Sequence, residues 1–96
     1  MARTRYLVSY DISSPRRLRK VAKTCEAFGS RIQYSVFECP LEPKRLQQLR
    51  AALDAIIHHE EDQILFISLG PAAGDASLSI EAMGVPYVVR SRVTII

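Results

Sequence analysis

The sequence has few of the residues and segments that cross-link, anchor or divide a protein. Its only cysteines are Cys25 and Cys39, which are too few for a disulfide framework or a zinc-binding set. No uninterrupted apolar run approaches the roughly 20 residues of a membrane span, and the N-terminus lacks the apolar stretch of a signal peptide. A chain of 96 residues has room for one hydrophobic core. We therefore expect a single domain over residues 1–96 that is cytoplasmic and not bound to a membrane.

The chain also has a small net charge of +3, which by itself does not identify a partner. Its distribution is uneven: residues 1–31 hold eight basic and two acidic side chains, whereas the remaining 65 residues carry a net charge of −3. This asymmetry indicates either that one end of the chain contacts a polyanion or that it forms a solvated face. A domain of this size leaves roughly a third of its unfolded surface exposed, so we also expect self-association.

The pattern of apolar residues predicts alternating strands and helices. Residues 5–12 alternate with a period of two, which is typical of a strand. One face of this strand carries Tyr6, Val8, Tyr10 and Ile12, and the other carries Leu7, Ser9 and Asp11. Ser13 or Ser14 as the N-cap and Pro15 in the first turn then begin a helix that ends at Gly29.

The middle of the chain continues the alternation. Residues 31–41 are rich in strand-forming residues, and they form either one strand or two short ones. A second helix begins at Pro43 and is predicted to end near residues 58–61. A strongly apolar strand over residues 63–69 follows.

The last part of the chain is a loop followed by strand-forming residues. Residues 70–79 are small and loop-like, and strand-forming residues return at 87–89 and 92–96. If the middle stretch is a hairpin, the order is the βαββαβ unit of the α+β ferredoxin-like fold, in which two helices cover one face of an antiparallel sheet. The other face stays open, and Asp11 points toward it. This open face is the expected place for a partner.

Asp11 is the most informative single residue. A carboxylate at the carboxyl end of a strand, on the face without helices, is accessible to a metal ion or a reacting phosphate. Alternatively, Asp11 is the N-cap or forms an Asx turn before the helix at Pro15. One carboxylate is a poor metal site, but a symmetric dimer would bring two copies together.

Five cations fall within eight residues at the start of the first predicted helix: Arg16, Arg17, Arg19, Lys20 and Lys23. Cations at a helix N-terminus oppose the helix macrodipole and therefore stabilise the free helix poorly. They suit an anion, because free N–H groups and guanidinium groups together bind phosphate without reading bases. The alternative is a solvated helix face.

A second surface is less specific. Cations and aromatics alternate at Arg31, Gln33, Tyr34 and Phe37, which could form an RNA-reading sheet surface or serve as core and edge residues of strands. Ser35 shows no sign of a paired base in the sequence, so nucleophilic catalysis by its hydroxyl is not indicated.

Several segments together resemble the small CRISPR-associated Cas2 family. They are Tyr10-Asp11-Ile12, the RLRKV run at 17–21, Gly29 and the RIQYSVFE run at 31–38. The resemblance extends over residues 62–69 and 80–86, and so covers nearly the whole chain. It implies a ferredoxin-like fold with two short middle strands, and a homodimer formed through the open sheet faces. The C-terminal strand, about residues 87–96, would then pair with the sheet edge of the partner protomer.

The resemblance also implies an activity. Family members are metal-dependent endonucleases that cleave RNA or DNA and accompany the CRISPR integrase in spacer acquisition. Asp11 of each protomer would flank one Mg²⁺ or Mn²⁺ ion and serve as the catalytic residue. Phosphate contacts are implied for Arg17, Arg19 and Arg31, and Arg16 belongs to the same cation cluster. Phe37 is implied to pack near the site, and Ser35 and Glu38 are further positions of the motif.

Two features set this chain apart from a complete metal site. The loop at residues 13–15 carries no additional acid, so Glu38 is the only nearby candidate for a second ligand. No general base is evident. The alternative is therefore a non-catalytic DNA-binding adaptor of the integrase, and a third possibility is an RNA-binding module.

Overall fold

The computed structural model describes residues 2–73 and 80–88, and its elements follow the order βαββαβ. They are β1 (Thr4–Asp11), α1 (Pro15–Glu26), β2 (Ser30–Gln33), β3 (Val36–Leu41), α2 (Pro43–Asp54) and β4 (Gln63–Pro71). The middle stretch is thus a hairpin of two short strands, which settles the alternative that the sequence left open.

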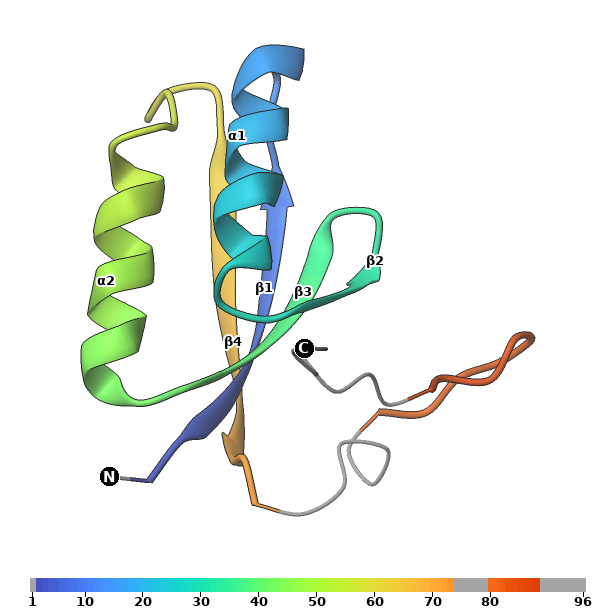
Figure 1. Cartoon of the computed structure of the whole chain (residues 1–96). Helices are drawn as coiled ribbons and strands as arrows, with labels where there is room; N and C mark the ends of the chain where they lie inside the picture. The colour runs from blue at the N-terminus through green and yellow to red at the C-terminus, as the bar shows by residue number, and fades with distance from the viewer. Residues whose placement is uncertain (1, 74–79, 89–96) are drawn as a thin grey trace, which may run out of the picture.

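The four strands form one sheet in the order β2-β3-β1-β4, and every neighbouring pair is antiparallel. Both helices lie on the same face of this sheet (Figure 1). The opposite face carries no helix or strand from the described part of the chain. The predicted α+β ferredoxin-like fold is confirmed.

The alternation of β1 divides its side chains between the two faces as predicted. Val8 and Tyr10 are buried beneath the helices, and Ile12 continues the same side just after the strand. Asp11, on the other side, is exposed. The rest of the core comes from both helices and from β3: Val21, Cys25, Phe37, Cys39, Leu41, Leu49 and Leu53.

Ser14 begins α1. Its side chain accepts a hydrogen bond from the backbone N–H of Arg17 at 3.3 Å, and Pro15 occupies the first turn. Because Ser14 is the N-cap, the alternative that Asp11 caps this helix is wrong. After α1, the buried Gly29 leads the chain into β2 against the backbone of β3, where a Cβ atom would overlap the carbonyl oxygen of Glu38 and Cys39 Sγ.

The second helix ends earlier than predicted, at Asp54 rather than near residues 58–61. The apolar periodicity misled the prediction because Ile56 and Ile57 still pack against the core after the helix has ended. Both residues donate their backbone N–H groups to the carbonyl oxygen of Leu53, which closes the last turn. A separate turn over residues 58–62 then leads into β4.

The C-terminal predictions are only partly covered by the described residues. β4 continues through Pro71 into the segment predicted as a loop. Tyr87 and Val88 adopt neither helix nor strand, so the strand predicted at 87–89 is absent at these two positions. Residues 74–79 and 89–96, including the predicted C-terminal strand, lie outside the described residues. In the described ranges, no helix has the length and hydropathy needed to cross a bilayer.

The carboxylate of Asp62 joins three segments at one end of the sheet. It accepts hydrogen bonds from the backbone N–H of Ser13 at 3.0 Å and from that of His58 at 2.8 Å. Arg17 Nε donates to the same carboxylate at 2.7 Å. The side chain of Asp62 has no exposed area. The hydrogen bond from Arg17, together with the two backbone donors, holds the pKa of Asp62 well below its usual range.

Substitution of Gly29 by alanine should destabilise the fold. The Cβ atom would meet backbone atoms of β3, which cannot move aside as a flexible side chain can. We expect Gly29→Ala to lower the free energy of unfolding by about 3 kcal/mol, at the upper end of the range for overpacking. Urea unfolding followed by circular dichroism measures this loss, and an unchanged midpoint would contradict the close approach.

Stability at acid pH should depend on Asp62. A carboxyl group whose pKa is lowered on folding contributes stability above its unfolded pKa of about 3.9, and this contribution is lost as the pH falls further. The unfolding free energy of wild type should therefore fall more steeply below about pH 4 than that of Asp62→Asn. Urea titrations from pH 7 down to pH 3 test this, with the exposed Asp54→Asn as the control. Parallel curves for wild type and Asp62→Asn would argue against the prediction.

Candidate functional site

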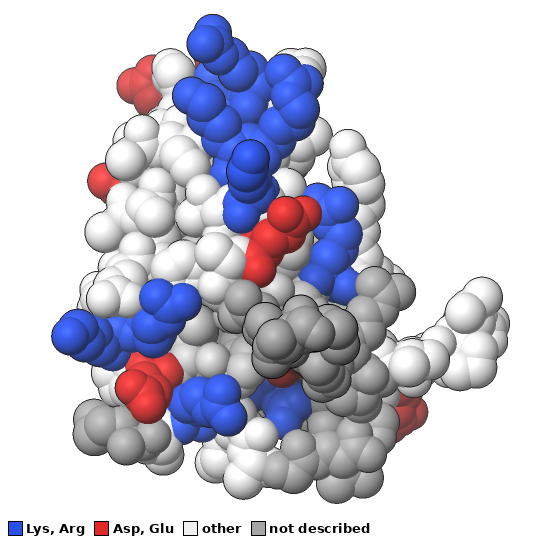
Figure 2. Space-filling model, in the orientation of Figure 1, with Lys and Arg blue, Asp and Glu red and all other residues white. Residues whose placement is uncertain are grey.

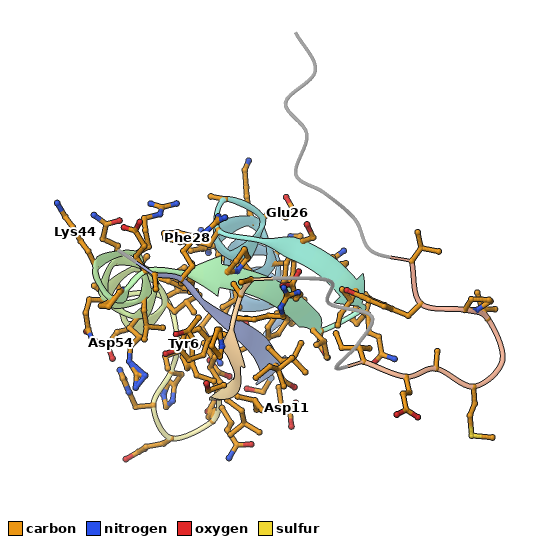
Figure 3. The ribbon with its side chains drawn as sticks, turned by 90° about the horizontal axis from the view of Figure 1, so that it is seen from below. Tyr6, Asp11, Glu26, Phe28, Lys44 and Asp54 are labelled. Atoms are coloured by element: carbon orange, nitrogen blue, oxygen red, sulfur yellow. The ribbon has the colours of Figure 1, made fainter. Side chains whose placement is uncertain are left out.

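Asp11 is the last residue of β1 and lies opposite Gln63 of β4. Figure 3 shows Asp11 and Glu26, which ends α1, on opposite sides of the sheet. The Asp11 side chain is exposed, and its carboxylate makes no hydrogen bond or ion pair with the residues that the structure describes. Its exposed position on the face without helices agrees with the sequence prediction, and its role as a ligand stays a prediction.

Two turns flank this end of β1. The turn between β2 and β3 is held by Tyr10, whose backbone N–H donates to the carbonyl oxygen of Ser35 at 3.1 Å and whose hydroxyl donates to that of Tyr34 at 3.4 Å. On the other side, the turn at residues 58–62 leads directly into Gln63, which pairs with Asp11. Ser35 thus contributes its backbone to the turn that borders Asp11.

The cation cluster of α1 divides into one engaged and several free side chains. Arg17 makes the bond to Asp62 described above and also donates from Nη2 to Glu61 at 3.2 Å. The hydrogen bond to Asp62 raises the pKa of Arg17, so its charge is permanent but already paired. The other members are exposed and form no ion pair among the described residues, namely Arg16, Arg19, Lys20 and Lys23. Figure 2 shows basic side chains gathered over α1.

Arg31 lies at the sheet edge, on the side of the helices. Its guanidinium group stands 5.2 Å from the ring centre of Phe37 and 5.8 Å from that of Tyr34. Phe37 is fully buried and stacks on Tyr10, so it belongs to the core beneath the helices, on the face of the sheet opposite Asp11. Tyr34 is 74% exposed and is the only one of these aromatic rings that a base could reach.

Glu38 does not lie beside Asp11 within one protomer. The register of β1 and β3 places it opposite Leu7, four residues before Asp11 along the strand. Glu38 is buried and forms an ion pair with Arg5 at 3.3 Å. The expectation that Glu38 is a nearby second ligand is therefore wrong for a single chain, because the register, and not proximity in sequence, sets the neighbours.

Sequence reasoning missed the carboxylates that do lie at this end of the sheet, which are Glu61 and Asp62. The signal was present, because three consecutive acids at residues 60–62 directly precede β4, which pairs antiparallel with β1. Asp62 is occupied by its donors, and Glu61 is largely exposed. Among residues 2–73 and 80–88, no group of three or more His, Cys, Asp or Glu side chains is arranged to hold a metal ion. Within the described part of the chain, the Asp11 carboxylate thus has no second metal ligand beside it that the structure identifies.

Comparisons with known proteins agree with this architecture. The family model described as CRISPR associated protein Cas2 matches residues 4–73. The CRISPR-associated endoribonuclease Cas2 of Geobacter sulfurreducens is 46% identical over 67 residues, which are 70% of each chain. The CRISPR-associated endoribonuclease Cas2 1 of Rhodospirillum rubrum is 38% identical over 87 residues, or 91% of this chain and 84% of that one.

A solved structure supports the same assignment. The crystal structure of Streptococcus pyogenes Cas2 at pH 6.5 superposes with a TM-score of 0.73 and 36% sequence identity, and the match covers 83% of this chain and 99% of that chain. The match to the family model spans both helices and all four strands of the sheet. The chain therefore belongs to the CRISPR-associated Cas2 family.

Proposed function

We propose that this protein is a metal-dependent endonuclease that cleaves phosphodiester bonds of RNA or DNA in CRISPR spacer acquisition. The observation that carries the proposal is the exposed carboxylate of Asp11 at the carboxyl end of β1, just before a helix rich in cations. Neither Asp11 nor the cations Arg16 and Arg19 have a partner among the described residues. The relatives named endoribonucleases support a nuclease over a binding module.

The proposed active form is a homodimer through the open sheet faces. Leu65 and Ile67 of β4 pair with Ser9 and Leu7 of β1 and so share the face of Asp11. They remain 47% and 43% exposed in the single chain, so this face leaves apolar side chains in contact with water. Burying this face against a second copy would remove it from solvent and bring two copies of Asp11 to one interface.

The residues of one chain fit a divalent ion only if further oxygen ligands come from a second chain, water or substrate. Mg²⁺ and Mn²⁺ prefer oxygen ligands, and Mg²⁺ commonly takes one or two carboxylates together with water and substrate phosphate. Asp11 would hold the ion, with the second carboxylate supplied by the other protomer. When bound, the ion would acidify a water molecule and stabilise charge on the phosphate. The free guanidinium groups of Arg16 and Arg19 would bind and orient the phosphate backbone.

A second candidate function is a non-catalytic DNA-binding adaptor of the CRISPR integrase. Both histidines make local contacts, His58 with the backbone N–H of Glu60 and His59 with Asp54, so neither is poised as a general base for a substrate at Asp11. The unpaired cations of α1 are sufficient for backbone binding without any chemistry.

Removal of the Asp11 charge should separate catalysis from binding. We expect Asp11→Asn to reduce Mg²⁺- or Mn²⁺-dependent cleavage by about 100-fold or more, because it removes the charge that would hold the ion. Cleavage of single-stranded RNA, single-stranded DNA and duplex DNA is measured over a metal titration. Glu26→Gln, an exposed carboxylate on the other side of the sheet, should cleave like wild type. If Asp11→Asn cleaves undiminished, the nuclease proposal fails.

Charge reversal on α1 tests the binding surface and distinguishes the two functions. Arg19→Glu should weaken nucleic-acid binding and reduce the salt dependence of log Kd by about one counterion, as expected for a lost phosphate contact. Lys44→Glu makes the same charge change on α2 and serves as the matched control. In a spacer-integration assay, an adaptor requires the α1 cations but tolerates Asp11→Asn, whereas loss of integration in Asp11→Asn would exclude a purely adaptor role.

A further inference from the structure

We propose that Asp62 is the positioning residue for Asp11. We also propose that Arg17 holds the Asp62 carboxylate in place instead of contacting nucleic acid. The inference rests on the proposed role of Asp11. It assigns a function to a carboxylate that is far from Asp11 in sequence, and it separates Arg17 from the neighbouring arginines of the same helix.

The first observation is the number of segments that Asp62 ties together. Its carboxylate accepts the backbone N–H of Ser13, just before α1, and the backbone N–H of His58, in the turn that leads to β4. It also accepts Nε and Nη2 of Arg17, at 2.7 and 3.1 Å. A fifth hydrogen bond comes from Ser13 Oγ at 3.2 Å, so both carboxylate oxygens are fully engaged, and the side chain is fully covered.

The second observation is the place of these bonds relative to Asp11. Ser13 follows Asp11 by two residues, and Gln63, the neighbour of Asp62, pairs with Asp11 across the sheet. The segment from Asp11 to Ser13 is therefore held at both ends, at Ser13 by the hydrogen bond to Asp62 and at Asp11 by the pairing with Gln63. Ile12, between Asp11 and Ser13, is buried in the core and supplies a third attachment. A shift of the Asp11 backbone would have to break one of these attachments.

The third observation concerns Arg17. Its Nε and Nη2 atoms form a bidentate, charge-assisted pair of hydrogen bonds with Asp62. Nη2 also donates to Glu61 and to Ser13 Oγ. Such bidentate pairs are stronger than ordinary hydrogen bonds. To contact a phosphate with the same atoms, Arg17 would have to leave the covered Asp62 carboxylate without its cation. Arg16 and Arg19 face no such cost, because they are exposed and unpaired among the described residues.

The experiment compares matched pairs of substitutions. Asp62→Asn removes the charge and keeps the shape, and Glu61→Gln does the same to the adjacent exposed carboxylate. Arg17→Met is compared with Arg19→Met. For each protein, four quantities are measured: kcat and KM for cleavage, Kd for the same nucleic acid in EDTA, the thermal midpoint, and hydrogen exchange at the backbone amides of Asp11 and Ile12.

We expect Asp62→Asn and Arg17→Met to lower kcat by about 10- to 100-fold, the range for a misplacement of about 1 Å at a reacting group. KM, and Kd in EDTA, should stay within about twofold, since neither residue would contact nucleic acid. Arg19→Met should instead raise Kd and KM, and Glu61→Gln should resemble wild type. The double variant Asp62→Asn with Arg17→Met should lose no more than either single variant, because the two residues act as a unit.

Three results would overturn the proposal. One is a Kd in EDTA that rises as much for Arg17→Met as for Arg19→Met, because Arg17 would then be a phosphate ligand. Another is a lower thermal midpoint for Asp62→Asn with unchanged kcat, which would make the cluster merely structural. The third is unchanged amide exchange at Asp11 and Ile12. If Asp62→Asn does not fold, Arg17→Met decides by the same readouts.

Failure of the proposed function can be recognised separately. If wild type cleaves none of the three substrates at any metal concentration, the endonuclease proposal fails. The proposed positioning of Asp11 by Asp62 is then tested by amide exchange and Kd alone. Faster exchange at Asp11 and Ile12 in Asp62→Asn, with unchanged Kd for Arg17→Met, supports it. Unchanged exchange, or a raised Kd for Arg17→Met, overturns it.

Discussion

The pairing of β1 with strands on both sides is the constraint on which the rest of the molecule depends. β1 lies between β3 and β4, so its register decides which side chains meet the helices and which face the open side. A shift of one residue would turn Val8 and Tyr10 outward and direct Asp11 into the core. The cost of burying that charge without a partner, added to the loss of the apolar core, fixes the register. The position of Asp11 is therefore a consequence of packing on the opposite face.

Electrostatics at the start of α1 depend on a residue from another part of the chain. The first turn of α1 holds no acid, although an acid there would favour the helix dipole. Asp62 brings a negative charge to the residues that lead into the helix, and Arg17 pairs with it. The cations that make α1 attractive to phosphate are thus tolerated partly because β4 begins with an acidic neighbour. The same contact links the helix to the strand end that carries Asp11.

Local patterns in the sequence were enough to predict β1, α1 and a helix start at Ser13 or Ser14. They predicted the βαββαβ order only on the condition that the middle stretch forms a hairpin. The hairpin in the middle stretch could not be decided, because its turn at Tyr34 and Ser35 contains no glycine or proline. The end of α2 was misplaced for a different reason, since Ile56 packs on the core whether or not the helix continues.

The site itself was less predictable than the fold. Asp11 could be located from the alternation of one strand, whereas its neighbours depend on registers between distant segments. For this reason Glu38 was expected nearby and Asp62 was overlooked. Arg17 and Arg19 are both arginines in the same cation cluster of α1, so the sequence gives no reason to assign them different roles. Only the tertiary contact of Arg17 with Asp62 distinguishes them.

The proposed dimer and the proposed metal ion are physically coupled. Two Asp11 carboxylates brought to one apolar interface repel each other, and burial raises the cost of each charge. A divalent cation between them would offset both terms, whereas without it the two charges would weaken the interface. In the proposed dimer, Leu65 and Ile67 would supply the apolar contact that favours association, and Asp11 would oppose it. In the proposed dimer, the open face would therefore combine an apolar attraction with a charge repulsion that a divalent cation would relieve. This coupling is a physical reason for the site at Asp11 to be completed by a second copy of the chain.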